Sequence, residues 1–392
     1  LGDVYKRQIL ACSGFVTSLT IVLIVLFLFS EAVGLFNSRV IEEGYVLALN
    51  KDNKVSELTP VQIKDIFDEE ITNWQEVGGE NLPIRLFRLE DVTRYYTEEQ
   101  LGAFYENVGA CITDLVERTP GIVAFVPQQF IGSSGAVRLL PDNTISLKDV
   151  FARAEWFPTA TPAPQFGFLP LITGTLWVSL FAILIALPFG LAVAVYMSEV
   201  ANHKIRNLMK PIIELLSGIP SVVYGFFGLI VIVPFLQKVF DLPVGESGLA
   251  GSIVLAIMAL PTIITVTEDA MRNCPRAMRE ASLALGASQW QTIYKVVIPY
   301  SISGITSGVV LGIGRAVGET MAVLMVTGNA AVIPHTILEP LRTIPATIAA
   351  ELGEAPAGGA HYEALFLLGV VLFFISLLIN FTVEAVSSGK RK

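Results

Sequence analysis

Long uncharged apolar runs alternate with shorter charged segments along this chain. A helix needs about 20 apolar residues to cross a bilayer whose hydrocarbon core is about 30 Å thick. Six runs meet that length, at residues 9–30, 166–198, 212–236, 249–266, 302–327 and 364–383. This pattern predicts an all-α integral membrane protein with six transmembrane helices.

The charged segments predict the orientation of these spans, because loops rich in Lys and Arg stay on the cytoplasmic side. Basic residues precede the first run, follow the second and the fourth, and end the chain. They are Lys6, Arg7, Lys204, Arg206, Lys210, Arg272, Arg276, Arg279, Lys295, Lys390, Arg391 and Lys392. We expect both termini in the cytoplasm and residues 37–165 outside it. The first run is too long for the apolar part of a signal peptide, so helix 1 (9–36) is predicted to remain as an anchor.

Residues 37–165 form a polar insert between the first two spans and predict a small α/β extracytoplasmic unit. Strands are expected at 46–49, 84–89 and 121–126. Helices are expected at 59–67, where Thr59 and Pro60 are typical of a helix start, and at 97–106. The proline-rich segment 157–165 is predicted to be a linker into the permease core at 166–386.

Composition narrows the class of protein. Only 16% of the residues are charged, against about 25% in soluble domains. The insert holds 11 Lys or Arg and 20 Asp or Glu, which accounts for the net charge of −9, so nucleic-acid binding is not expected. The cysteines Cys12, Cys111 and Cys274 lie far apart, and no disulfide framework, metal site or cofactor is predicted.

The basic loop 272–299 between the fourth and fifth spans is amphipathic. Gly286 can adopt the positive φ that joins two short helices, and Pro299 is expected to end the second of them. Two short helices at the cytoplasmic face would make a knob that a partner can hold. The chain has no P-loop motif that could bind ATP, so any ATPase must be a separate subunit.

This loop resembles the EAA loop of ABC importer permeases, in which Glu-Ala-Ala, a glycine and a terminal Ile-x-Leu-Pro recur at fixed spacing. The matching residues are Glu280, Ala281, Ser282, Gly286, Val296, Ile298 and Pro299. The resemblance implies a type I ABC importer permease fold, with two copies of an ATP-binding subunit docked at the cytoplasmic face. The alternative is an ordinary basic loop between two spans.

The fifth span carries two charges. On one continuous helix, Gly304, Gly308, Gly312, Arg315 and Glu319 would share one face. Small residues let helices approach closely in lipid, and charges in a span usually face the interior or a water-filled path. Arg315 and Glu319 could form a structural ion pair or, alternatively, a gate that attracts an anion.

Three runs resemble the phosphate importer permeases of the PstC type: 314–322, 219–225 and 343–351. The resemblance implies that Arg315, Glu319 and Thr320 line the path of phosphate, with Pro220 and Tyr224 as weaker candidates. It also implies a second homologous permease subunit, a periplasmic phosphate-binding protein and the cytoplasmic (inner) membrane.

The insert resembles part of the periplasmic phosphate-binding protein at 58–67, 71–74, 83–84 and 120–126. That family binds phosphate with an arginine and a Ser-Gly-Thr turn. Here Arg88 is kept, but the turn is absent and Glu90 and Asp91 are acidic. The fragment is about one lobe, so we expect a degenerate lobe that docks the binding protein or shields the outer mouth. The alternative is a decoration without a transport role.

Two other functions fit parts of the sequence. A permease for sulfate, molybdate or phosphonate would share the loop 272–299 but not the motif around Arg315 and Glu319. A membrane phosphate sensor would share the six spans and the outer domain. The resemblance of the loop 272–299 to the EAA loop disfavours the sensor function.

Overall fold

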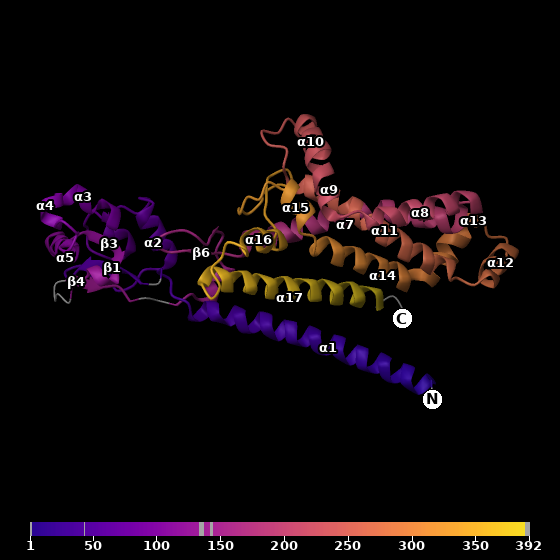
Figure 1. Cartoon of the computed structure of the whole chain (residues 1–392). Coiled ribbons are helices and arrows are strands. Elements are labelled where there is room, and N and C mark those ends of the chain that lie inside the picture. The colour runs from indigo at the N-terminus through magenta and orange to yellow at the C-terminus, as the bar shows by residue number, and fades with distance from the viewer. Residues whose placement is uncertain (1, 43, 133–136, 142–143, 389–392) are drawn as a thin grey trace. The chain divides into compact units, whose positions relative to one another are not determined.

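The computed structural model describes residues 2–42, 44–132, 137–141 and 144–388 (Figure 1). The chain divides into two compact units, which we describe separately. The membrane unit comprises Leu1–Phe29, Leu169–Ala355 and Leu365–Lys392, and the insert unit comprises Ser30–Phe168 and Pro356–Ala364.

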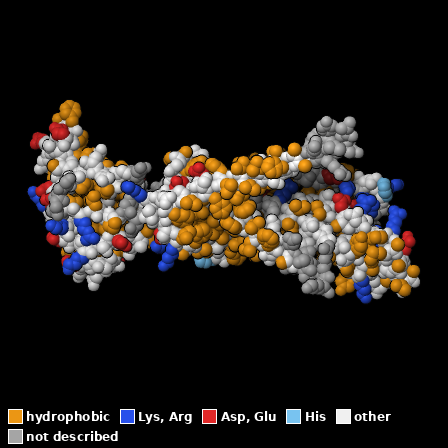
Figure 2. All heavy atoms as spheres, turned by 90° about the horizontal axis from the view of Figure 1, so that it is seen from below, with side chains coloured by type: hydrophobic (Ala, Val, Ile, Leu, Met, Phe, Trp, Pro, Cys, Tyr) orange, Lys and Arg blue, Asp and Glu red, His pale blue; other side chains and the backbone are white. Residues whose placement is uncertain are grey.

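Within the described residues, six helical segments are long and apolar enough to cross a membrane, which confirms the six predicted spans. They are Ala11–Asn37, Leu169–Val200, Ser221–Phe240, Gly248–Arg272, Gln289–Val317 and Ala360–Val383. The principal helices are α1 (Gly2–Gly34), α7 (Leu169–Val195), α8 (His203–Gly218), α9 (Ser221–Phe227), α10 (Val233–Phe240), α11 (Gly248–Arg272), α14 (Ile298–Val317), α15 (Met321–Val326), α16 (Ile344–Glu351) and α17 (Ala360–Ser388). Figure 2 shows a broad apolar surface over this unit, with charged side chains gathered toward its end.

Helix α11 is the centre of the membrane unit. In its most apolar stretch 61% of the residues are buried, against 11% in the span that contains α1. It packs against α7 and α14. A Cβ on Gly312 of α14 would lie 2.7 Å from Ile263 of α11, and one on Gly308 would lie 3.1 Å from Thr267. The predicted close approach along the glycine face of α14 is confirmed.

Two predicted spans have different limits in the structure. The third begins at Ser221 rather than at residue 212, because Ile219 is extended before Pro220 and α8 ends there. A residue before proline is disfavoured in the helical region, which explains the break. The fifth span ends at Val317 rather than at residue 327, and α15 follows as a separate short helix.

The insert unit contains a four-stranded sheet in the order β2-β3-β1-β4, as expected for a small α/β unit. Its strands are β1 (Tyr45–Asn50), β2 (Arg85–Arg88), β3 (Ile122–Pro127) and β4 (Val137–Leu139). Strand β3 runs parallel to β2 and antiparallel to β1. The helices α2 (Pro60–Phe67) and α5 (Val108–Arg118) complete it, and Thr59 caps α2 as predicted. A closed apolar cluster that includes Phe87, Ile112 and Val126 forms its core.

The helix predicted at 97–106 is wrong. Only the single turn α4 (Glu98–Leu101) forms, and Gly102 ends it with φ +86°. The longer helix, α5, begins six residues later, and its apolar positions Val108, Ile112 and Val116 face the core. Their four-residue spacing is the signal that could have identified it.

The segment predicted as a linker is folded. Strands β5 (Trp156–Phe157) and β6 (Gln165–Phe166) pair at its two ends. The Gln165 Nε2 atom donates to the carbonyl of Pro60 at 3.0 Å. The segment is therefore part of the insert unit rather than a free connection.

Candidate functional site

The loop 272–299, which is predicted to dock an ATPase and is called the coupling loop below, contains α12 (Arg276–Ala284) and α13 (Gln289–Thr292), joined at Gly286. Gly286 has φ +86°, a conformation that residues with a Cβ rarely adopt. Ser288 caps α13, since its Oγ accepts from the Gln291 N–H at 3.3 Å. The hydroxyls of Ser282 and Thr292 lie 3.0 Å apart and join the two arms. The two-helix knob predicted around Gly286 is thus present.

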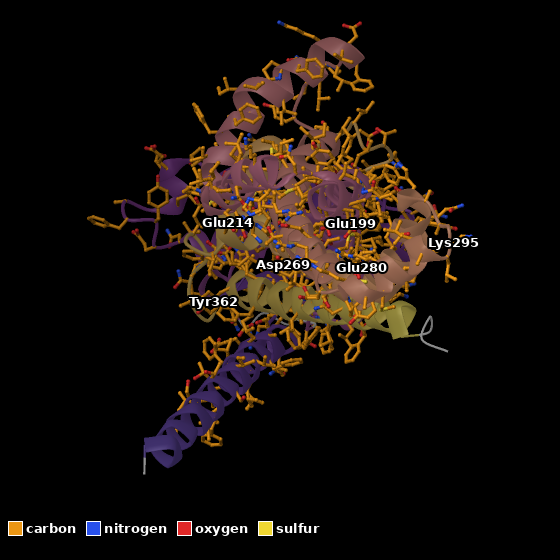
Figure 3. The ribbon with its side chains drawn as sticks, turned by 90° about the vertical axis from the view of Figure 1, so that its right-hand side faces the viewer. Glu199, Glu214, Asp269, Glu280, Lys295 and Tyr362 are labelled. Atoms are coloured by element: carbon orange, nitrogen blue, oxygen red, sulfur yellow. The ribbon has the colours of Figure 1, made fainter. Side chains whose placement is uncertain are left out.

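The solvent side of this loop is unusually apolar for a charged end of the protein. Leu285 is 89% exposed, Trp290 67% and Tyr294 69%. Glu280 and Ala281 are exposed on α12 beside them. Figure 3 looks onto this end and shows the positions of Glu199, Asp269, Glu280 and Lys295. Large exposed apolar side chains beside charged ones are compatible with a surface that binds another protein.

The predicted end of the second loop helix at Pro299 is wrong. Helix α13 continues through a π-helical turn, Ile293–Val297, into α14. Ile298 and Pro299 follow this π turn directly, so Pro299 lies inside a continuous helical path rather than at its end. The wider π turn provides the local adjustment that lets the helical path continue past proline. The loop is therefore joined to the fifth span without a hinge at Pro299.

Arg315 and Glu319 are separated by the end of a helix. Arg315 lies in the last turn of α14, whereas Glu319 lies in the break before α15. Glu319 Oε1 accepts from the Ala322 N–H at 3.4 Å, and Thr320 is the residue before the helix. Across the described residues no ion pair joins Arg315 to Glu319. The structural ion pair considered from the sequence is therefore not formed.

The candidates Pro220 and Tyr224 lie beside this break. A Cβ on Gly225 of α9 would lie 2.9 Å from the Ala322 Cα of α15, so the two helices are in close contact. Pro220 precedes α9, and the Tyr224 hydroxyl donates to the Leu216 carbonyl at 2.7 Å. Tyr224 therefore holds the turn between α8 and α9.

Three hydroxyl side chains that were not predicted from the sequence share a small gap with Glu319. Thr175 and Ser179 of α7 and Thr343 before α16 line the same small packing gap as Glu319. The Thr175 Oγ1 accepts from the Ile344 N–H at 2.9 Å. The Thr343 hydroxyl is buried and has no hydrogen-bond partner among the residues described. The hydroxyl residues Thr173, Thr175 and Ser179 in an apolar span were the available signal.

In the insert, the region around Arg88 is filled by the chain's own charges. The Asp91 Oδ2 accepts from the backbone N–H of Arg88 at 3.1 Å, and Asp91 Oδ1 lies 2.9 Å from Arg94 Nη1. The Arg88 guanidinium stacks 5.4 Å from the centre of the Phe67 ring. Glu69 and Glu90 line the same hollow. The Arg88 backbone N–H and the Arg94 guanidinium therefore already face the Asp91 carboxylate.

Known proteins resemble both units. The sequence profile of the family described as "Binding-protein-dependent transport system inner membrane component" matches residues 186–392, and that of the PBP superfamily domain matches residues 29–143. The chain is 40% identical to the probable ABC transporter permease protein YqgH of Bacillus subtilis (strain 168) over 262 residues, covering 67% of this chain and 84% of that protein. It is 39% identical to the phosphate transport system permease protein PstC of Mesorhizobium japonicum over 244 residues, covering 57% and 73% of the two chains. Among solved structures, the inward-facing MetNI methionine ABC transporter aligns with a TM-score of 0.43 and 20% identity, over 57% of this chain and 94% of that chain.

Proposed function

Because this chain belongs to the family of binding-protein-dependent transport system inner membrane components, we propose that it is the permease subunit of an ABC importer that moves inorganic phosphate across the cytoplasmic membrane. The observation that supports phosphate as the transported substrate is the 39% identity to a protein named phosphate transport system permease protein PstC. The run 314–322, which resembles the phosphate-permease signature, lies at the break between α14 and α15.

Arg315 is the residue that attracts phosphate into the path. Its guanidinium offers a planar fork of donors that matches an oxyanion. No carboxylate forms an ion pair with it among the described residues, so its charge can act on a passing anion. Thr320 follows Glu319 in the same break, and Glu319 shares a small, mostly apolar gap with the hydroxyls of Thr175, Ser179 and Thr343. Pro220 and Tyr224 support the wall beside it.

The coupling loop is the docking surface for a separate ATP-binding subunit. Glu280, Ala281 and the exposed Leu285, Trp290 and Tyr294 form that surface. When the ATP-binding subunits close on ATP, they move the loop. The importer contains two ATP-binding subunits and two permease subunits, this chain and a homologous one. This chain contributes no ATP chemistry of its own.

The alternation of basic and acidic loops favours a topology with both termini in the cytoplasm and residues 37–165 outside. In this topology the insert faces the compartment in which a phosphate-binding protein delivers its cargo. The domain limits 9–36, 37–165 and 166–386, with the coupling loop at 272–299, are proposed on the same basis.

The insert is a degenerate lobe that docks the phosphate-binding protein or shields the outer mouth. Asp91 places a carboxylate on the Arg88 N–H and on Arg94, where an anion would need those donors. An anion entering the hollow would meet Glu69, Glu90 and Asp91. Electrostatic repulsion therefore disfavours phosphate there.

We expect an isolated insert fragment, residues 30–168, to show no heat of phosphate binding at micromolar concentrations. The fragment carries its own apolar core, and circular dichroism would verify that it is folded. Asp91→Asn removes the competing carboxylate and should raise the affinity for phosphate, whereas Asp52→Asn, a change at an exposed turn, should leave it unchanged. Micromolar binding by the unmodified fragment would contradict the degenerate-lobe proposal.

Competition for uptake tests the cargo. Proteoliposomes that hold the complete importer should accumulate radiolabelled phosphate, and excess sulfate, molybdate or phosphonate should not compete with it. Inhibition by one of these oxyanions at the concentration that suffices for unlabelled phosphate would instead support the alternative permease. ATP-independent signalling without uptake would support a phosphate sensor.

A further inference from the structure

The cytoplasmic end of the second span is bonded to both arms of the coupling loop. Glu199 lies in a π-helical turn, Tyr196–Val200, that extends α7. Arg279 of α12 places its Nη2 2.8 Å from the Glu199 Oε1. Gln289, the first residue of α13, donates from Nε2 to the Glu199 carbonyl at 3.1 Å. One residue thus contacts the loop on both sides of Gly286.

The pair of Glu199 and Arg279 is shielded and oriented by neighbours. The two side chains are 8% and 24% exposed, respectively. The Ser198 hydroxyl donates to Glu199 Oε1 at 2.8 Å, and Arg279 Nη2 also donates to the Met271 carbonyl of α11 at 2.8 Å. Charge-assisted hydrogen bonds with little access to water are short and directional. The contact therefore holds the end of the second span in a defined position relative to α12.

The same π turn is held from its other side. Arg206 of α8 donates from Nε to the Met197 carbonyl at 2.9 Å, and its Nε lies 3.9 Å from Glu268 Oε1 of α11. Glu268 is only 1% exposed. The π turn ends the helix at Val200, and the last carbonyls of a helix have no partner within the helix. Here the carbonyls of Met197 and Glu199 accept hydrogen bonds from Arg206 of α8 and Gln289 of α13.

We propose that Glu199, with Arg279 as its partner, transmits the movement of the coupling loop to the second span. The peptide chain connects the loop directly to the fourth and fifth spans, α11 and α14. The second span packs against α11, and among the described residues its polar contacts with the two helices of the loop are those of Glu199 with Arg279 and Gln289. Glu199 and Arg279 are therefore positioning residues of the transport cycle. This inference rests on the proposed docking of an ATP-binding subunit to the loop.

A purely structural ion pair would affect the amount of assembled complex but not the phosphate carried per ATP. Lys204 provides a control, because it is an exposed cation of α8 and lies outside the coupling loop. We expect Glu199→Gln and Arg279→Gln to assemble with the ATP-binding subunit and hydrolyse ATP, with phosphate transported per ATP lowered about tenfold. Lys204→Gln should keep the wild-type ratio.

The charge swap Glu199→Arg with Arg279→Glu should recover much of the lost ratio. If the Glu199→Gln variant does not assemble with the ATP-binding subunit, the charge swap still tests whether the ion pair is needed for coupling. Recovery of both assembly and coupling supports the proposal, whereas an assembled swap that stays uncoupled, like an unchanged ratio in either single variant, overturns it.

A second readout does not depend on the cargo. Spin labels on cysteines at Tyr196, which is 42% exposed, and at the exposed Ala277 report the distance between the second span and α12. With the pair intact, this distance should be the same before and after the ATP-binding subunit is trapped with vanadate. In Glu199→Gln it should change on trapping, and an unchanged distance would overturn the proposal. A wild-type complex that passes this test but moves no phosphate would refute the proposed cargo and not the role of Glu199.

Discussion

Replacing Arg315 with alanine is expected to lower ATP-dependent phosphate uptake about 100-fold, because a fixed charge in a narrow path raises the arrival rate of an oppositely charged substrate by 10–1,000-fold. Arg315 lies half-buried in the last turn of α14, at the helix break that also contains Glu319 and Thr320. Among the described residues no ion pair depends on it, so its removal should leave the packing of α14 in place.

Two variants separate the charge of Arg315 from its shape. Arg315→Lys keeps the charge but loses the planar fork, so uptake should fall by less than in the alanine variant. Lys238→Ala removes a positive charge from an exposed position on α10 and should leave uptake unchanged. Wild-type uptake by Arg315→Ala, in a complex shown to be assembled, would remove Arg315 from the pathway.

Replacing Gly286 with proline is expected to abolish the coupling of ATP hydrolysis to uptake. Proline fixes φ near −65°, whereas Gly286 has φ +86°. The turn between α12 and α13 would have to open, and the surface formed by Leu285, Trp290 and Tyr294 would lose its arrangement. ATPase activity and uptake, measured in the same proteoliposomes, should show hydrolysis without transport or loss of the ATP-binding subunit.

Substitutions of Gly286 by residues that adopt a positive φ with different ease provide the controls. No atom lies within 4 Å of a Cβ built there, so a substitution acts through the backbone rather than through a clash. Asparagine adopts this conformation more readily than other residues with a Cβ, while valine in it costs about 1–2 kcal/mol or more. Coupling should therefore decrease in the order Asn, Val, Pro. Full coupling in Gly286→Pro would refute the assignment of the loop.

The spans were predictable because burial in lipid requires uninterrupted apolar runs, and such runs are visible in sequence. The breaks at Pro220 and after Val317 were harder to place, because hydropathy averaged over the length of a span does not register a few polar residues. Gly318, Glu319 and Thr320 lie at the second break, between the end of α14 and the start of α15. Pro299 misled in the opposite direction, because the π turn before it lets the helix continue past proline.

The candidate site was predicted in its residues but not in its geometry. Arg315 and Glu319 were expected one turn apart on a continuous helix, and the helix end between them separates their side chains. The hydroxyls of Thr175, Ser179 and Thr343 come from segments distant in sequence, so only the folded structure places them beside Glu319. The contact of Glu199 with Arg279 likewise joins residues 80 positions apart.

Phosphate uptake by the reconstituted importer tests the central proposal most directly. Proteoliposomes that contain this chain, the second permease subunit, the ATP-binding subunits and the phosphate-binding protein should accumulate radiolabelled phosphate when ATP is present on the side of the coupling loop. Omitting ATP, or omitting this chain, should abolish accumulation. Uptake that persists without this chain, or a complete complex that hydrolyses ATP and accumulates another solute but no phosphate, would contradict the proposed function.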